Sequence, residues 1–281
     1  MWLTSHQLAR ALAGTIRWQT SSRPRVWIFR PRLEALEDRT LLSPYIVTTT
    51  ADSGFGSLRD AITQVNADTN HALYASPSNP NVDEIEFNIT AASDAAGGGT
   101  GYNSATGVAT IQPGVGTALT LPALTNRVLI EATSQPGYAG KPVIVLDGTH
   151  AGSGANGLVL TASAAGSTVQ GFVIDHFSGN GIEVDGGGNN VIANNYIGVN
   201  ATGIGAAGNG RDGIVLTNSS GNTIGGTTTA ARNVISGNGG DGIALTGSGT
   251  TGNVVEGDYV GTDATGSAAL DAPTAYGFDG G

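Results

Sequence analysis

The spacing of apolar residues near the start of the sequence predicts a short strand followed by one amphipathic helix. Residues 45–50 are rich in β-branched side chains and predict the strand. Ser57 stands three residues before Asp60, which is the spacing of a capping box, so we expect a helix of about ten residues to begin at Leu58. Its apolar face has the spacing i, i+3, i+4 and i+7, at Leu58, Ala61, Ile62 and Val65.

Between this helix and residue 156 the apolar pattern is irregular. Residues 70–80 are polar and predict a loop, and the Gly-rich residues 91–107 predict a long excursion from the fold. Apolar runs in the rest of this region are short, as in half-buried or buried strands. These expected strands lie at residues 83–89, 118–121, 128–132 and 143–146.

From residue 156 onward the chain repeats itself every 23 to 32 residues. One landmark is a polar residue followed by Gly and an aliphatic residue, at 156–158, 180–182, 212–214 and 241–243. A second landmark is a single aliphatic residue, at Val169, Ile192, Ile224 and Val255. A third is a short polar-aliphatic group, at 195–198, 233–236 and 258–261. The clearest repeats span residues 156–266.

Three short strands in each unit predict an all-β, three-sided solenoid. A strand this short is unstable alone, but coils stacked at about 4.8 Å pair each strand with those above and below it. Gly and Asn tolerate the positive φ expected at the corners. Asn190, Asn222 and Asn253 stand two residues before successive copies of the second landmark, so we expect them to stack as a side-chain ladder, with glycan contact as the alternative role.

Several phrases of the repeat resemble a known family. Residues 195–198, 222–226 and 232–238 resemble the right-handed parallel β-helix repeat family, which shares its fold with pectate lyases. Residues 57–62 resemble the CSLREA motif that begins many bacterial β-helix proteins, with Gly56 in place of Cys and Asp60 in place of Glu. The resemblance implies a right-handed parallel β-helix over residues 44–281 with a short N-terminal capping helix. The entrance cap is then residues 44–70, because the first coil of a solenoid has an edge that must be covered.

The first 43 residues differ in charge from the rest of the chain. They hold seven Arg and three acidic residues, a net charge of +4, and no continuous apolar core of a standard signal peptide. Residues 30–43 resemble the LExLExRxLLS segment near the N-terminus of many bacterial extracellular proteins, which implies export or sorting and an extracellular or cell-surface location. The alternative is a short amphipathic helix that leads into the fold.

The remaining chain is acidic and lacks Cys. Residues 44–281 carry a net charge of −14, which repels phosphate backbones, so nucleic acid is an unexpected partner, whereas cations and neutral glycans are compatible. The absence of Cys excludes disulfides and thiolate metal sites. No run of 18 apolar residues occurs, so no transmembrane helix is expected.

The densest group of ionisable residues supplies the candidate catalytic site. Enzymes on this fold act mainly on acidic polysaccharides, and a lyase or hydrolase needs carboxylates or an Arg to converge from neighbouring coils. Asp147 is expected one coil before the group. The alternative is that these side chains are exposed on the outer face without a function. The candidates are Asp175, His176, Glu183, Asp185 and Arg211.

No cofactor is expected, with one exception. Asp212 and Asp241 share a corner position with Asn156 and Asn180, and stacked carboxylates repel unless a cation lies between them. They are therefore candidate Ca²⁺ ligands, although the nonapeptide repeat of Ca²⁺-binding β-rolls is absent.

The sequence favours an extracellular or cell-surface module with a structural, adhesive or glycan-contacting role. The alternative is a polysaccharide lyase or glycoside hydrolase that acts on an acidic polysaccharide. By the register of the repeat, a further coil is expected to begin at residues 276–281. We therefore expect a truncated chain, or one that continues into a partner at an uncapped C-terminal coil.

Overall fold

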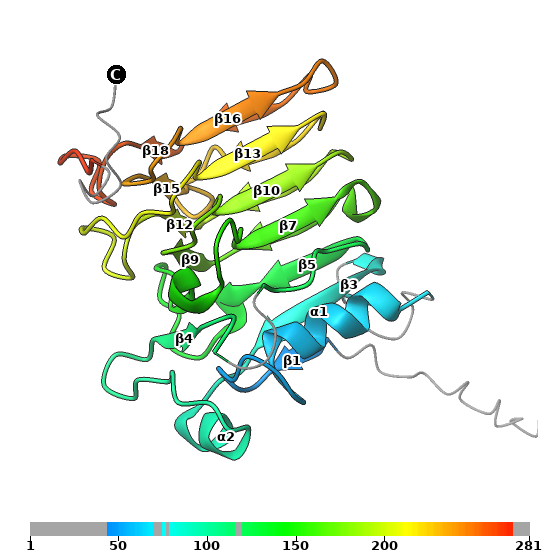
Figure 1. Ribbon diagram of the computed structural model, residues 1–281, viewed down its shortest axis with the longest axis vertical. Helices are drawn as coiled ribbons and strands as arrows, with labels where there is room; N and C mark the ends of the chain where they lie inside the picture. Colours follow the sequence, from blue (N-terminus) through cyan, green and yellow to red (C-terminus); the bar gives the residue numbers. More distant parts are fainter. Residues whose placement is uncertain (1–43, 70–74, 77–78, 116–119, 272–281) are drawn as a thin grey trace, which may run out of the picture. The chain divides into compact units, whose positions relative to one another are not determined.

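The computed structural model describes residues 44–69, 75–76, 79–115 and 120–271. The predicted leader at residues 1–43 and the further coil expected at 276–281 lie outside these residues. The described chain is mostly β-structure, arranged as a solenoid of stacked parallel strands (Figure 1). No helix in this part of the chain is long and apolar enough to span a membrane.

Three sheets run along the stack. Sheet A contains β1 (Tyr45–Val47), β3 (Asn79–Phe87), β5 (Val128–Glu131), β8 (Thr168–Gln170), β11 (Val191–Ala193), β14 (Thr223–Gly225) and β17 (Val254–Glu256), with β2 (Ala75–Ser76) antiparallel to β3. Sheet B contains β4 (Ala109–Ile111), β6 (Ile144–Asp147), β9 (Phe172–Asp175), β12 (Tyr196–Ile197), β15 (Val234–Ile235) and β18 (Tyr259–Val260). Sheet C contains β7 (Leu158–Thr161), β10 (Ile182–Asp185), β13 (Ile214–Thr217) and β16 (Ile243–Thr246).

The landmarks of the repeat are stacked in register, which confirms the three-sided arrangement. In sheet C, Ile182 pairs with Leu158 on one side and with Ile214 on the other. In sheet A, Ile192 pairs with Val169 and Ile224. Their side chains point inward and are 0–1% exposed, so one continuous apolar core runs up the inside of the coils.

The Gly residues of the first landmark are required for a different reason from the one expected. Gly157, Gly181 and Gly213 do not have positive φ. A Cβ on Gly181 would lie 2.7 Å from the carbonyl oxygen of Gly213, and a Cβ on Gly157 would lie 2.4 Å from that of Gly181. These glycines therefore permit close stacking of successive corners, and the expectation of positive φ was wrong at this position.

The predicted Asn ladder is present, together with two more. The amide of Asn190 donates to Asn222 at 2.9 Å, and that of Asn222 donates to Asn253 at 2.8 Å. A second ladder consists of Asn195, Asn233 and Asp258. A third consists of Asn209 and Asn238. In these ladders Oδ1 of each later member also accepts the backbone N–H of the member before it, so the buried corners are satisfied internally except at Oδ2 of Asp258.

Helix α1 (Leu58–Ala67) has the predicted start and length. Ser57 is its N-cap and accepts the backbone N–H of Asp60 at 3.2 Å. The four apolar residues of its predicted face are buried and join the core of the first coils, and the helix lies beside β1 and β3 (Figure 1).

The irregular region before residue 156 departs from the prediction in several places. Strand β3 begins at Asn79, and β2 precedes it, so the described part of 70–80 is not a plain polar loop. The excursion at 91–107 contains a helix, α2 (Ala91–Ala96), capped by Thr90. No strand forms at Thr120 or Leu121, the described part of 118–121, whereas β4 was not predicted.

The outer face of sheet B is covered by the chain's own loops. Its outward residues Val145, Val173, Tyr196 and Val234 form a second small apolar cluster with Val199. Ala201, Ala264 and Leu270, from loops that follow β12 and β18, pack against this cluster. These outward residues of sheet B are therefore closed to solvent, at 0–7% exposure.

Candidate functional site

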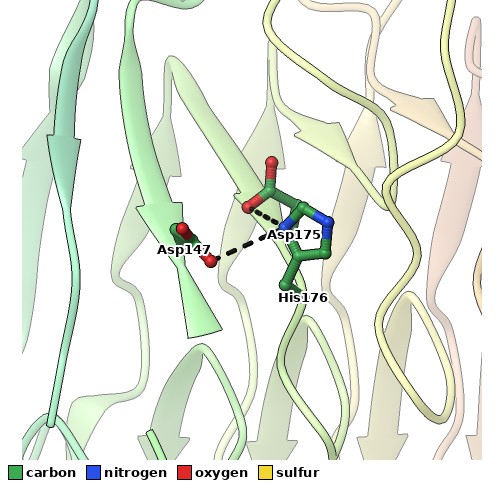
Figure 2. A group of neighbouring side chains, drawn as sticks. All are labelled: Asp147, Asp175 and His176. Atoms are coloured by element: carbon green, nitrogen blue, oxygen red, sulfur yellow. Dashed lines mark hydrogen bonds and ion pairs between the residues drawn. The ribbon is translucent and has the colours of Figure 1, made fainter. Parts of the chain in front are cut away.

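A cluster of two carboxylates and an imidazole lies where strands β6 and β9 of sheet B end. Asp147 and Asp175 are the last residues of these strands and pair directly in the parallel register. His176 follows Asp175 in the left-handed region, with φ of 56°. Its Nδ1 lies 3.2 Å from Oδ1 of Asp175 and 3.5 Å from Oδ1 of Asp147 (Figure 2). Adjacent coils therefore bring all three ionisable groups together, as the sequence predicted for Asp147 and Asp175.

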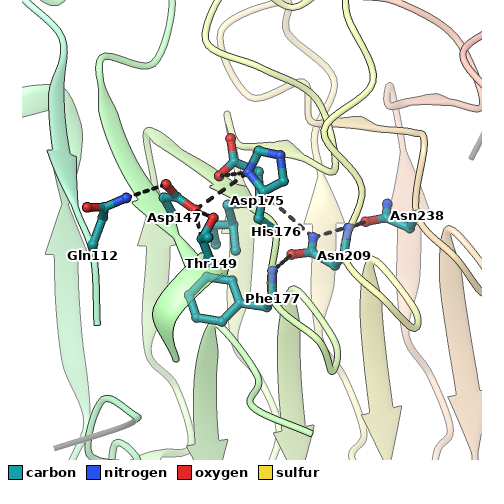
Figure 3. Close-up of polar contacts among 9 residues, drawn as sticks. Gln112, Asp147, Thr149, Asp175, His176, Phe177, Asn209 and Asn238 are labelled. Atoms are coloured by element: carbon teal, nitrogen blue, oxygen red, sulfur yellow. Dashed lines mark hydrogen bonds and ion pairs between the residues drawn. The ribbon is translucent and has the colours of Figure 1, made fainter. Parts of the chain in front are cut away.

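Asp147 is held by neighbours on both sides. Nε2 of Gln112 donates to its Oδ2 at 2.7 Å, and the backbone N–H of Thr149 donates to its Oδ1 at 3.0 Å (Figure 3). Burial acts to raise the pKa of Asp147, but the bonds from Thr149 and Gln112, together with nearby His176, outweigh it and hold this pKa below its usual value.

Asp175 has the opposite environment. It is 5% exposed, and its hydrogen-bond partner is the imidazole of His176. Burial raises the pKa of Asp175, and the charge of Asp147 adds to this effect, whereas His176 acts against it. The two carboxyl groups of the cluster are therefore unequal in acidity.

His176 links the pair to solvent. Its side chain is 50% exposed, whereas those of Asp147 and Asp175 are 17% and 7% exposed. The hydrogen bond with Asp175 raises the pKa of His176, although burial opposes this, and the charges of Asp175 and Asp147 add to the rise. The imidazole is thus the accessible member of the cluster.

The other predicted members lie elsewhere. Glu183 and Asp185 are on β10 in sheet C, beyond the corner that follows His176. Glu183 is half-buried and accepts a hydrogen bond from the amide of Asn156, and Asp185 is exposed. Arg211 is exposed at the next coil's corner, where its backbone N–H donates to Gly179. The structure therefore divides the predicted acidic group between two sheets.

The candidate Ca²⁺ residues form a corner column with their Asn counterparts. The backbone N–H of Asp241 donates to Oδ1 of Asp212 at 2.8 Å, and that of Asp212 donates to Asn180 at 3.1 Å. Asp212 is half-buried and Asp241 is exposed. The column links successive corners through backbone amides, and Ca²⁺ binding there stays a prediction.

A polar cleft of about 760 Å³ lies beside the first coils. It is lined by residues 50–53, 98–104 and 110 together with Gln112 and Val115. Gln112 therefore has its place both in the cleft wall and in the hydrogen-bond network of Asp147. The cleft offers hydroxyl, amide and backbone groups and one aromatic ring, that of Tyr102.

Sequence reasoning missed Gln112 and Thr149 as partners of Asp147. Thr149 follows Asp147 by two residues, a spacing typical of an Asx turn, so its signal was present in the sequence. Gln112 is 35 residues from Asp147 and depends on the unpredicted strand β4. Figure 3 also shows the ladder of Asn209 and Asn238, which begins at the backbone of Phe177, next to the cluster.

These features define an all-β parallel solenoid with a partly exposed Asp–Asp–His cluster at the ends of two neighbouring strands. A scan against models of known protein families found no matching family. A search of curated proteins found no similar sequence. The chemistry that the cluster supports therefore follows from its own geometry.

Proposed function

We propose that this chain is an extracellular or cell-surface module built on a right-handed parallel β-helix of the pectate-lyase-like type. Its role is structural or adhesive, with contacts to glycans, and is not catalytic. The leader-like residues 1–43 support export, and the strict repeat supports the fold type.

The observation that supports this role most strongly is how the polar residues of the repeat are used. The Asn and Asp residues of the three buried ladders bond to one another and to the backbone, so their presence is explained by stacking. A catalytic groove on this fold requires ionisable groups from several neighbouring coils. The ladder residues are buried or half-buried instead and form no part of an outer groove.

The outer face of sheet C also fits a contact surface, although Val215 on it is buried. One of its columns consists of Thr161, Asp185, Thr217 and Thr246, and the next of Val159, Glu183, Val215 and Ala244. Apart from the acidic pair on β10, these side chains are small and uncharged. Such a face can lie flat against a neutral glycan, whose hydroxyl groups complement Thr side chains.

The polar cleft is the second place for glycan contact. Its volume of about 760 Å³ lies within the range of small-molecule sites. Tyr102 provides an aromatic surface beside the polar side chain of Asn103. A sugar ring can pack on the aromatic side chain while its hydroxyl groups bond to the polar wall.

Binding of the full chain to an array of neutral and uronate-containing glycans tests the proposal. Reducing ends and unsaturated products are measured in parallel with the same glycans. Binding without product is the expected result. Loss of binding in Asn103→Ala would locate it in the cleft, and loss in Thr217→Ala would locate it on sheet C. Product formation would overturn the non-catalytic role.

One observation favours a second function, a glycoside hydrolase. The pKa of Asp147 is lowered and that of Asp175 is raised, which is the division of roles between a nucleophile or base and an acid. This alternative predicts turnover of an acidic polysaccharide that is lost in both Asp147→Asn and Asp175→Asn. The matched control is Asp185→Asn, whose carboxylate lies on sheet C and should leave turnover unchanged.

A further inference from the structure

We infer that Asp147, Asp175 and His176 form a binding site for a divalent transition-metal ion of the Zn²⁺ type. These are the described residues whose potential ligand atoms come together, with one atom from each lying within 4.8 Å of the others. The site is separate from the proposed glycan contacts, because its three ligands lie at the ends of sheet B strands, although Gln112, a partner of Asp147, also lines the cleft.

The charge of the cluster favours a bound cation. Asp147 and Asp175 face each other across two paired strands, and the charged groups that act on Asp175 are His176 and Asp147. No Lys or Arg side chain of the described chain contributes to this balance. When the imidazole is neutral, two carboxylates are left together without a cation, and a bound dication compensates them.

Asp175 is largely buried and has few protein partners. This residue is only 5% exposed, and its Oδ1 is hydrogen-bonded to the imidazole of His176. Its Oδ2 accepts no hydrogen bond from any described residue. The charged form of this largely buried carboxylate has one protein partner, and coordination of a cation would stabilise it further. Figure 2 shows Oδ1 of Asp175 directed toward the imidazole, where it can share a cation with Nδ1.

The distances fit tetrahedral coordination. Zn²⁺ binds nitrogen and oxygen ligands at about 2.0–2.1 Å, so two ligand atoms at a tetrahedral angle are about 3.3 Å apart. Nδ1 of His176 lies 3.2 Å from Asp175 and 3.5 Å from Asp147. The ion would then draw the two carboxylate oxygens closer together than their present separation of at most 4.8 Å.

The surroundings hold the ligands in place and leave one side open. Gln112 and Thr149 fix the carboxylate of Asp147 by hydrogen bonds, as the outer partners of metal ligands usually do. The half-exposed ring of His176 gives a path to solvent, and water can complete the coordination. Three protein ligands that include imidazole favour Zn²⁺ over Ca²⁺, which takes six to eight oxygen ligands.

Isothermal titration of the full chain with ZnCl₂, and separately with CaCl₂, tests the inference. The buffer is held at about pH 8, because the ligands must be deprotonated. The key variant is His176→Asn, since Asn adopts the left-handed conformation at positions 189, 194 and 218 of this chain and so preserves the backbone. Asp175→Asn removes a second ligand, and His150→Asn is the control, because His150 is exposed and outside the cluster.

We expect one Zn²⁺ site that is weakened about 100-fold by His176→Asn and about 10–100-fold by Gln112→Ala, which acts through Asp147. Binding by His150→Asn should equal that of the wild type, and Co²⁺ should give a tetrahedral visible spectrum that is lost in His176→Asn. Zn²⁺ binding that survives His176→Asn, no binding at all, or Ca²⁺ binding as strong as Zn²⁺ binding would each overturn the inference. None of these results bears on glycan binding, so the two proposals fail separately.

Discussion

Replacement of Asp258 by Asn should stabilise the last described coil. Asp258 ends the ladder that begins with Asn195 and Asn233, and its Oδ1 accepts both N–H groups of Asn233 at 2.8 and 3.0 Å. Its Oδ2 is buried without a hydrogen-bond partner. In the preceding coils the equivalent atom is an amide nitrogen, which donates to the backbone oxygen of Val169 in one coil and of Ile192 in the next.

The magnitude follows from these contacts. By the register of sheet A, the new amide of Asp258→Asn would donate to the oxygen of Ile224, which pairs with Ile192. Removal of an unsatisfied buried oxygen is worth about 1–3 kcal/mol, and Asp258, being half-buried, lies at the lower end. Loss of attraction to Arg232 offsets up to about 1 kcal/mol. The new hydrogen bond to Ile224 adds about 0.5–1.5 kcal/mol, so the expected net gain is about 1–2 kcal/mol at neutral pH.

The gain should depend on pH in a defined direction. Burial raises the pKa of Asp258, although its bonds to Asn233 and the charge of Arg232 act against this, and Glu256 adds to the rise. The folded state therefore favours the protonated acid of Asp258. The stability that protonated Asp258 contributes is fully present below the pKa of Asp258 in the unfolded chain, and it is lost as pH rises through the higher pKa of Asp258 in the folded chain. Protonated Asp258 resembles Asn, so the advantage of Asp258→Asn should vanish below about pH 4.

Hydrogen exchange of the amides of Tyr259 and Gly261, which bond to the coil below, measures this stability locally. Thermal unfolding complements it, with an expected rise in Tm of about 2–8 °C. Asp241→Asn is the control, because it removes the same charge from an exposed corner of the same coil. A neutral or destabilising Asp258→Asn at pH 7, or an equal effect at pH 4 and pH 7, would refute the reasoning.

Three further substitutions test the packing of the solenoid, each by urea-induced unfolding. Gly181→Ala should lower the free energy of unfolding by about 3 kcal/mol or more, because the new Cβ meets a carbonyl oxygen at 2.7 Å. The control is Gly137→Ala, at φ of 96° in open space, which should lower it by only about 1–2 kcal/mol. Equal losses would contradict the stacking role of Gly181. Asn222→Ala should lower the free energy of unfolding by about 3 kcal/mol, because the backbone N–H and the side-chain amide of Asn190 both lose their acceptor. A change below about 0.5 kcal/mol would show that the ladder contributes nothing. Leu58→Ala should cost about 2–5 kcal/mol through loss of buried contact between α1 and the first coils; an unchanged midpoint would exclude a capping role for the helix.

The repeat was predictable because its signal is local and recurs. Each coil places the same residue types at the same corners, so the pairing of Ile192 with Val169 and Ile224 follows from counting residues. The first coils could not be predicted in the same way. Helix α2 depends on a capping box at Thr90 and on Asp94, whose buried carboxylate accepts bonds from Thr50, 44 residues away. No periodic pattern in the sequence predicts a contact between residues so far apart.

The site was predictable only in part, for the same physical reason. Asp147 and Asp175 were expected on neighbouring coils, and the register confirms that they are paired. Glu183 is closer to Asp175 in sequence than Asp147 is. However, the chain turns a corner of the solenoid between Asp175 and Glu183, so Glu183 lies on sheet C. In a solenoid, residues one coil apart are neighbours in space, whereas residues eight apart in sequence often lie on different faces.

The cluster also shows how such a fold can hold a specific site without loss of its regularity. The position that follows the aliphatic pair of sheet B is Asp175 on β9, but it is Gly198 after β12 and Ser236 after β15. A different residue at this outward position does not alter the inward core residues or the Asn ladders, because both stack at other positions of the coil. Two neighbouring coils with carboxylates are sufficient to create a charged pair, and one residue at positive φ, His176, completes it. The ladders therefore maintain the stack, and the charged cluster lies where one outer column departs from the repeat.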